Sequence, residues 1–213
     1  MSRNTEDLIA DLAAAAEPVR RLAPPMTRAL LWLGTVALIC AALILKLSNL
    51  SLFAERASDP RLAVELVSTL ATGVAGVVAA FHLSVPDRPR AWALLPAPFA
   101  ALWLSASGLG CWKYWTEQTA HGWRLGASSH CMVFLLGVGA VLGGALLFSL
   151  RRARPLQPRL VAAVGATGVA ALAAFILQFF HPFDVTLIDL GAHLAALSIL
   201  IVVISVVGRP GLA

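Results

Sequence analysis

The residues best suited to chemistry gather in one polar stretch, GLGCWKYWTEQTAHGWRLGASSHCM, at positions 108–132. It holds two of the three cysteines, two of the five histidines and three of the six tryptophans. Cysteine and histidine together suit soft or borderline metal ions, and a pair of thiols can also respond to oxidants. The candidate sensing residues are therefore Cys111, His130 and Cys131, together with His181 at the start of a later polar break.

Metal binding and thiol oxidation at this patch each have a purely structural alternative. The histidines and cysteines lack Cys-x-x-Cys or His-x-x-x-His spacing, so the sequence predicts no cofactor, and a metal ion at this patch is kept as an alternative. A disulfide between Cys111 and Cys131 needs Cα atoms within about 7 Å, which a simple helical return permits and does not require. The thiols otherwise serve as packing residues, and the tryptophans fit the aromatic belt of a membrane interface.

The apolar character of the remaining chain sets the fold class. Hydrophobic residues make up 59% of the 213 residues and charged residues 13%, against about 25% charged residues in a typical soluble domain. The apolar runs have the length that crosses a bilayer as a helix, and they lack strand-like alternation. The sequence predicts an all-α polytopic membrane protein with six transmembrane helices near 26–48, 62–84, 92–110, 130–150, 160–180 and 186–207. Pro96 and Pro98 fall in the first half of the third span.

Charge predicts the orientation of these spans. Six spans place both termini on one side. Eleven of the sixteen Lys and Arg residues fall on that side: before span one and in its first turn, between spans two and three, between spans four and five, and in the tail. The positive-inside rule therefore predicts a cytoplasmic N-terminal segment at 1–25, a transmembrane domain at 26–207 and a cytoplasmic tail at 208–213. The polar stretch then lies on the outer face. The bilayer is a partner, whereas no basic domain is present that would bind nucleic acid directly.

The ionisable residues within the predicted spans include Glu65, Asp189 and His193. Asp189 and His193 share a helix face at i, i+4 spacing, and such residues usually face the bundle interior and pair. A transport path needs polar groups through the full depth, but these three cluster toward the outer half. This placement argues against a transporter. The sequence also shows no nucleophile–base pair and no phosphate-binding loop, so we predict a protein that is not an enzyme.

The head, NTEDLIADLAAAAEPVRRLAPP, predicts a short amphipathic helix. Asn4 or Thr5 would cap it, and Leu8, Ile9 and Leu12 recur at helical spacing on one face. The other face is acidic, which disfavours an anionic membrane surface. Two interpretations stay open on physical grounds: a frayed tail that sometimes lies on the membrane, or a helix that docks its apolar face into a groove on a cytosolic partner.

Several segments carry a resemblance to a known family. They are DLIADLAAAAEPVRRLAPPMTRALLWL, FHLSVPDRP, the HCM that opens span four, RRARPLQPRLVAAVGATGVAALAAFILQ, and the His-Pro after span five. Together they resemble the negative-regulator-of-sigma-F (NrsF) family of six-span bacterial membrane anti-sigma factors. The resemblance covers nearly the whole chain and depends on the order and spacing of these segments.

The resemblance implies a function in transcription regulation. In that family a cytoplasmic segment holds an extracytoplasmic-function sigma factor at the inner membrane, and an envelope stress signal such as a metal or an oxidant releases it. By position, Leu8, Ile9 and Leu12 would contact the sigma factor, and Arg20 and Arg21 would pair with its acidic residues. Cys131 corresponds to a cysteine that the family uses on its outer face.

One position departs from the family pattern. Members often have a second cysteine just before the proline after span five, where this chain has His181 followed by Pro182. Two substitutes are open: Cys111 acts as the thiol partner of Cys131, or Cys131 and His181 bind a metal ion. The departure also leaves an alternative function, a membrane redox or metal-handling protein whose working site is the Cys/His patch.

Overall fold

The computed structural model describes residues 4–16, 21–48, 50–56, 58–117, 125–180 and 187–212. Every regular element within these ranges is a helix, and six helices are long and apolar enough to cross a membrane. The predicted all-α class with six spans is therefore confirmed. The elements are α1 (Thr5–Ala14), α2 (Pro25–Leu47), α3 (Leu50–Arg56), α4 (Pro60–Leu83), η1 (Arg90–Leu94), α5 (Ala97–Glu117), α6 (Leu125–Leu150), η2 (Arg151–Ala153), α7 (Pro158–Leu177) and α8 (Leu187–Leu212).

Prolines mark where several of these helices begin. Pro25, Pro60 and Pro158 are each the first residue of a long helix. Proline suits this position because its fixed φ is helical and its missing N–H would have had no intrahelical acceptor there. The prolines of the third span follow the same rule. The sequence placed them inside a helix, whereas the structure has the short turn η1 first and begins α5 at Ala97.

Two of the predicted breaks contain helix. The first holds α3, a seven-residue helix between α2 and α4. The third is shorter than the polar composition indicated, because α5 continues to Glu117 and α6 already begins at Leu125. Polar residues here continue the helices beyond the apolar runs. Hydropathy alone therefore ended α5 too early and began α6 too late.

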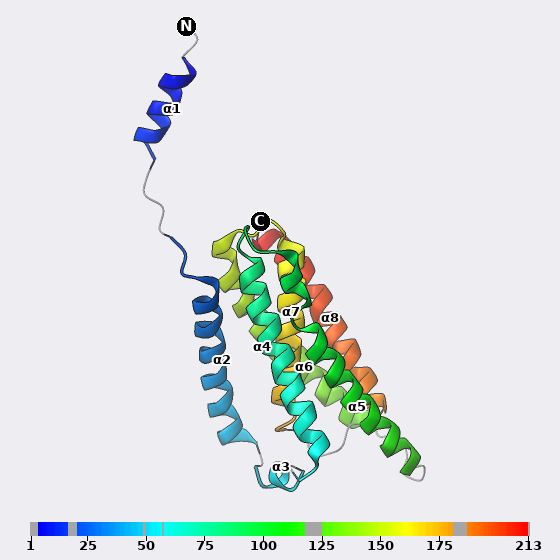
Figure 1. Ribbon diagram of the computed structural model, residues 1–213. Coiled ribbons are helices and arrows are strands. Elements are labelled where there is room, and N and C mark those ends of the chain that lie inside the picture. The colour runs from blue at the N-terminus through cyan, green and yellow to red at the C-terminus, as the bar shows by residue number, and fades with distance from the viewer. Residues whose placement is uncertain are drawn as a thin grey trace.

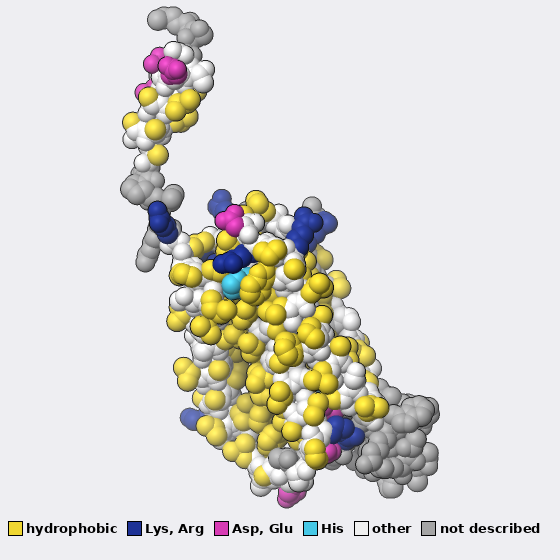
Figure 2. Space-filling view, viewed as in Figure 1, with side chains coloured by type: hydrophobic (Ala, Val, Ile, Leu, Met, Phe, Trp, Pro, Cys, Tyr) yellow, Lys and Arg dark blue, Asp and Glu magenta, His cyan; other side chains and the backbone are white. Residues whose placement is uncertain are grey.

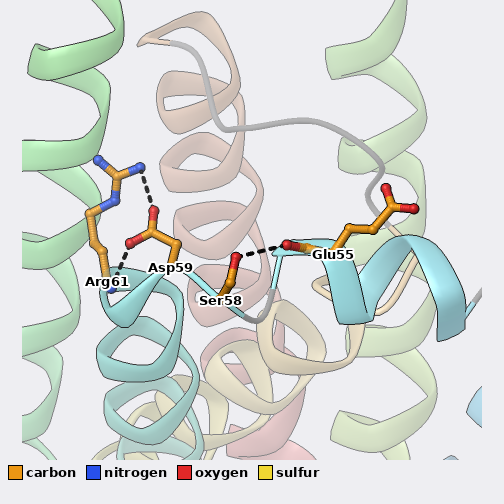
Figure 3. A network of polar contacts seen from close by, with 4 residues as sticks. All are labelled: Glu55, Ser58, Asp59 and Arg61. Carbon is orange, nitrogen blue, oxygen red and sulfur yellow. Dashed lines mark hydrogen bonds and ion pairs between the residues drawn. The ribbon is translucent and has the colours of Figure 1, made fainter.

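The start of α4 is fixed by a local polar network (Figure 3). Asp59 caps the helix: its Oδ1 accepts a hydrogen bond from the backbone N–H of Arg61 at 2.8 Å, and its Oδ2 lies 3.5 Å from the Arg61 guanidinium. The Ser58 hydroxyl donates to the carbonyl of Glu55 at 3.0 Å, at the end of α3. A cap of this kind satisfies N–H groups that lack an intrahelical partner, so the network sets the boundary between α3 and α4.

The centre of the bundle is the contact between α4 and α7, which run antiparallel (Figure 1). A Cβ on Gly76 would lie 2.6 Å from the Cα of Gly168, and a Cβ on Gly168 would lie 2.7 Å from the backbone nitrogen of Val77. Only glycine allows backbones to approach so closely, and this is how helices pack in lipid, where apolar area alone gives no preference. The pentapeptide ATGVA occurs on both helices, at 71–75 and 166–170.

The first long helix packs differently. Only Ala29 and Trp32 are buried on α2, and both lie near its beginning. Figure 1 shows α2 at one side of the bundle, with α1 beyond it and apart from all the long helices. The start of α2 and the end of α8 lie at the same end of the bundle, called here the head end. The opposite end, which carries α3, is called the far end.

Candidate functional site

The head helix α1 presents its apolar face to solvent. The exposed fractions of Leu8, Ile9 and Leu12 are 43%, 60% and 63%, and no residue of α1 is buried. Glu6 and Asp7 occupy the first turn, where carboxylates favour the helix dipole. Figure 2 shows yellow side chains along α1, away from the bundle. An amphipathic helix whose apolar face is left exposed by the described part of the chain has the geometry of a segment that binds a groove on a partner.

Of the two predicted arginine contacts, one lies in the described part of the chain. Arg21 is exposed in the connection between α1 and α2, and Arg20 falls outside the described residues. The structure therefore places Arg21 within reach of the same partner that would cover Leu8, Ile9 and Leu12. The helix itself forms where the sequence predicted it, after Asn4, although the Asn4 side chain makes no capping hydrogen bond.

The head end of the bundle is rich in arginine. Six exposed arginines surround it, from the α4–η1 connection, η2 and the start of α7: Arg88, Arg90, Arg151, Arg152, Arg154 and Arg159. We call them the arginine rim. Figure 2 shows dark blue side chains at this end, near the place where the head joins the bundle. Arg154 adopts the left-handed backbone conformation, with φ 41°, which non-glycine residues rarely use and which turns the chain sharply from η2 toward α7.

A buried junction connects α2 to the bundle just below this rim. The Arg28 guanidinium donates a hydrogen bond to the carbonyl of Ser149 on α6 at 3.1 Å, and its Cζ lies 5.1 Å from the ring centre of Phe81 on α4. Trp32, one turn further along α2, packs into the same core as Phe81. One arginine thus joins three helices at the point where the head enters the membrane domain. The i, i+4 spacing of Arg28 and Trp32 in the sequence is consistent with this role but does not by itself predict it.

His82 belongs to the same end of the bundle. Its ring stacks on Trp92 of η1, with centroids 4.0 Å apart and planes 8° apart. The side chain is buried, and among the described residues neither ring nitrogen has a hydrogen-bond partner. The stack fixes the turn between α4 and η1, because flat contact between two rings restricts both helices.

The far end contains the one predicted sensing side chain that the structure describes. Cys131 is 6% exposed and lies in an apolar cluster formed by α6, α7 and α8, whose other buried members are Leu135, Ala173, Ala174, Leu177 and Ala196. A buried thiol in apolar surroundings reacts slowly, because the reactive thiolate is disfavoured there. In the described structure, α6, α7 and α8 therefore cover most of the Cys131 side chain.

Aromatic contacts connect this cluster to the end of α7. Phe134 packs against the cluster, and its ring centre lies 5.5 Å from that of Phe180, the residue before His181. Next to it, Phe53 of α3 stacks on Phe179 at 4.6 Å. The far end thus couples Cys131, the end of α7 and the α3 connection through packed rings.

The other predicted site residues are placed less completely. The side chains of Cys111, His130 and Asp189, and the whole of His181, lie outside the described residues. Glu65 is buried on α4, and His193 is half-buried on α8. Among the described residues, no group of three His, Cys, Asp or Glu side chains is arranged to hold a metal ion. The buried hydroxyls near Glu65 bond within their own helix, as Thr72 does to the carbonyl of Ser68 at 2.7 Å.

The geometry thus offers an exposed helix at one end and a packed thiol at the other. A family model described as Negative regulator of sigma F (NrsF) matches residues 12–212. The chain belongs to the NrsF family. No curated protein sequence and no solved structure matches it significantly.

Membership in the NrsF family makes the protein a negative regulator whose partner is a sigma factor. The match includes all six long helices, so the regulator and the membrane-type bundle are one unit. It begins at Leu12, so Leu8 and Ile9 precede it. The assignment of α1 to partner binding therefore depends on the geometry of the helix itself.

Proposed function

We propose that this protein is a bacterial inner-membrane anti-sigma factor that holds an extracytoplasmic-function sigma factor through α1. The observation that carries the proposal is the apolar face of Leu8, Ile9 and Leu12, which stands in solvent on a helix with no buried residue. Such a face is unfavourable in water unless a partner covers it, since burying one leucine or isoleucine side chain is worth about 1.5–3 kcal/mol. A tethered helix of this kind keeps a bound sigma factor at the membrane, away from RNA polymerase.

The proposed orientation places the head end in the cytoplasm, with both termini. The six arginines of the rim lie at this end, and positive charge beside spans is retained on the cytoplasmic side. This orientation brings α1 into the compartment that contains sigma factors. It also places the far end, with Cys131, toward the outside.

We further propose that an envelope signal, a metal ion or an oxidant, acts at the far end through Cys131 and its neighbours Cys111, His130 and His181. Support comes from the packing of Cys131 at the meeting point of three helices. A bulky or charged group on this sulfur cannot fit the cluster, so modification favours a different packing of α6, α7 and α8. The change must then reach the head, and moving a sigma factor from about 1% to 99% release requires about 5.5 kcal/mol of differential binding.

The test of the partner site uses co-purification. The full-length chain is co-expressed with candidate sigma factors, and retention on membranes is measured for the natural chain and for Leu8→Asp/Leu12→Asp. We expect the double variant to lose the sigma factor, because each aspartate places a charge where the partner presents an apolar groove. The matched control is Ala10→Asp/Ala14→Asp, which adds the same charge on the opposite face of α1 and should retain the sigma factor. Equal retention by both double variants would exclude α1 as the contact.

The test of the signal asks whether a metal ion or a thiol oxidant releases the sigma factor through Cys131. Membranes carrying the complex are treated with Cd²⁺ or with diamide, and sigma factor in the soluble fraction is measured for the natural chain and for Cys131→Ala. We expect release that depends on Cys131. Release that is unchanged in Cys131→Ala would remove this thiol from the proposal and leave the partner site intact.

A further inference from the structure

The head and the bundle end from which it projects carry opposite charge. Within Thr5–Ala14 the charged residues are all acidic: Glu6, Asp7 and Asp11. The arginine rim carries six positive charges with Asp87 as the one exposed carboxylate in its loops. In the described part of the chain, no rim arginine has a carboxylate partner, and the Arg151 guanidinium stacks on Phe148 with its Cζ 3.8 Å from the ring centre.

The rim also contains an apolar contact point outside the spans. Leu156 is 76% exposed in the turn between η2 and α7, and the membrane-type stretches on either side end at Ala153 and begin again at Pro158. Four of the six rim arginines flank this leucine within five residues of the chain. A surface of positive charges around an exposed leucine is the complement of an acidic amphipathic helix.

The connection between the two surfaces is short enough to bring them together. Ten residues, 15–24, separate α1 from α2, and they span at most about 33–36 Å when extended. A short tether holds its ligand at an effective concentration in the millimolar range, so contacts too weak to form between separate molecules become populated. Individual exposed ion pairs are weak, so the docked state would be favoured only modestly.

We infer that α1 docks on the arginine rim when no sigma factor is bound, with Glu6 and Asp7 against the rim arginines and the leucine face over Leu156. This inference rests on the proposed function, because it makes the rim a competitor of the sigma factor for α1. If α1 is docked for 50–90% of the time, the apparent dissociation constant for the sigma factor rises about two- to tenfold. The rim would thereby set how readily a released sigma factor is recaptured.

The docking itself is tested without any sigma factor. Spin labels are placed at Ala10→Cys and Ala153→Cys in a chain with Cys40→Ala, Cys111→Ala and Cys131→Ala, and the distance distribution is measured in nanodiscs. We expect a short-distance population that Glu6→Lys/Asp7→Lys removes and that about 1 M NaCl reduces, since the screening length then falls to about 3 Å. The control Glu55→Lys changes the charge at the far end and should leave the population unchanged.

A charge exchange provides the decisive result. Adding Arg151→Glu/Arg152→Glu to Glu6→Lys/Asp7→Lys should restore the short distance, because the pairing is recovered with reversed signs. Failure to restore it, or a short population insensitive to both pairs of changes, overturns the inference. The inference is also overturned if the short-distance population vanishes when one third of the lipid is phosphatidylglycerol, because lipid headgroups would then occupy the rim.

Addition of the sigma factor separates this inference from the proposed function. A bound sigma factor should abolish the short distance, and Arg151→Glu/Arg152→Glu should strengthen sigma binding about two- to tenfold. Sigma binding without a short-distance population overturns the docking and leaves the anti-sigma function standing. A short-distance population in a chain that binds no sigma factor overturns the proposed function and, with it, the competition.

Discussion

The helices α2 and α7 have nearly the same hydropathy and opposite places in the bundle. Their mean hydropathy values are 2.3 and 2.4, yet 78% of the apolar stretch of α7 is buried within the protein against 6% of that of α2. α7 packs against α4, α6 and α8, whereas α2 is attached mainly through Arg28, Ala29 and Trp32. One helix is the centre of the fold, and the other lies at its edge and carries the head.

The difference shows that small residues, not hydropathy, select the central helix. Lipid and protein interior are about equally apolar, so a leucine gains little by exchanging one for the other. Glycine and alanine let two backbones approach, as Gly168 does against Gly76 and Val77. The large residues of α2 remain outside, with Leu30, Leu31 and Leu38 at least 60% exposed.

The largest expected effect comes from filling the central contact. Gly168→Leu should lower the free energy of unfolding by about 3 kcal/mol or more, because its side chain would have to displace the backbone of α4. Thermal unfolding in detergent, followed by circular dichroism, measures the loss. The control is Gly144→Leu, at a glycine of α6 with nothing within 4 Å of an added Cβ. Equal stability of the two variants would show that α4 and α7 do not form the core.

A smaller effect is expected where α2 joins the bundle. Arg28→Ala removes the hydrogen bond to Ser149 and the contact with Phe81, and should cost about 1.5–3 kcal/mol, the range for hydrogen bonds of charged groups. Unfolding by SDS titration, with Leu31→Ala on the exposed face as the comparison, gives the difference. If Leu31→Ala is as damaging as Arg28→Ala, α2 is held by its apolar face and the junction is unimportant.

The aromatic contact of α3 should contribute less to the free energy of unfolding than the Arg28 junction does. Phe53→Ala removes the stack on Phe179, worth about 0.5–1.5 kcal/mol beyond the apolar area that is lost. The same SDS titration measures it, and Leu50→Ala, at an exposed position of the same helix, is the control. A midpoint identical to that of Leu50→Ala would mean that α3 does not depend on α7.

The head should have the smallest effect on stability. Leu8→Asp/Leu12→Asp, which is expected to abolish sigma binding, should lower the thermal midpoint of the isolated protein by at most a few degrees, because α1 buries no residue in the structure and its proposed docking on the arginine rim is favoured only modestly. The measurement is the same detergent unfolding experiment without the sigma factor. A much larger drop, of about 10 °C, would show that α1 is packed on the bundle as firmly as a core helix.

Much of the fold could be predicted from the sequence because the relevant signals are local. Runs of apolar residues predict six long helices, and Asn4, Glu6 and Leu8 predict a head helix close to where α1 forms. The same local signals failed at α3, whose seven residues are too few for a periodic pattern, and at Pro96, which was expected inside a helix and lies immediately before α5. The candidate sites differ in the same way. The spacing of its residues predicted the apolar face of α1, whereas no local signal predicted the burial of Cys131.

The sequence by itself determined the helical class, the number of long helices and the placement of arginines near one set of helix ends. These properties depend on the free energy of transferring each stretch of residues between water and lipid. Residues that are neighbours along the chain set that free energy. Only the tertiary structure decided that α7 is central and α2 peripheral, that Arg28 joins three helices, and that Cys131 lies inside an apolar cluster. Those outcomes depend on which helix surfaces fit together, and residues far apart in the chain supply the two sides of each contact.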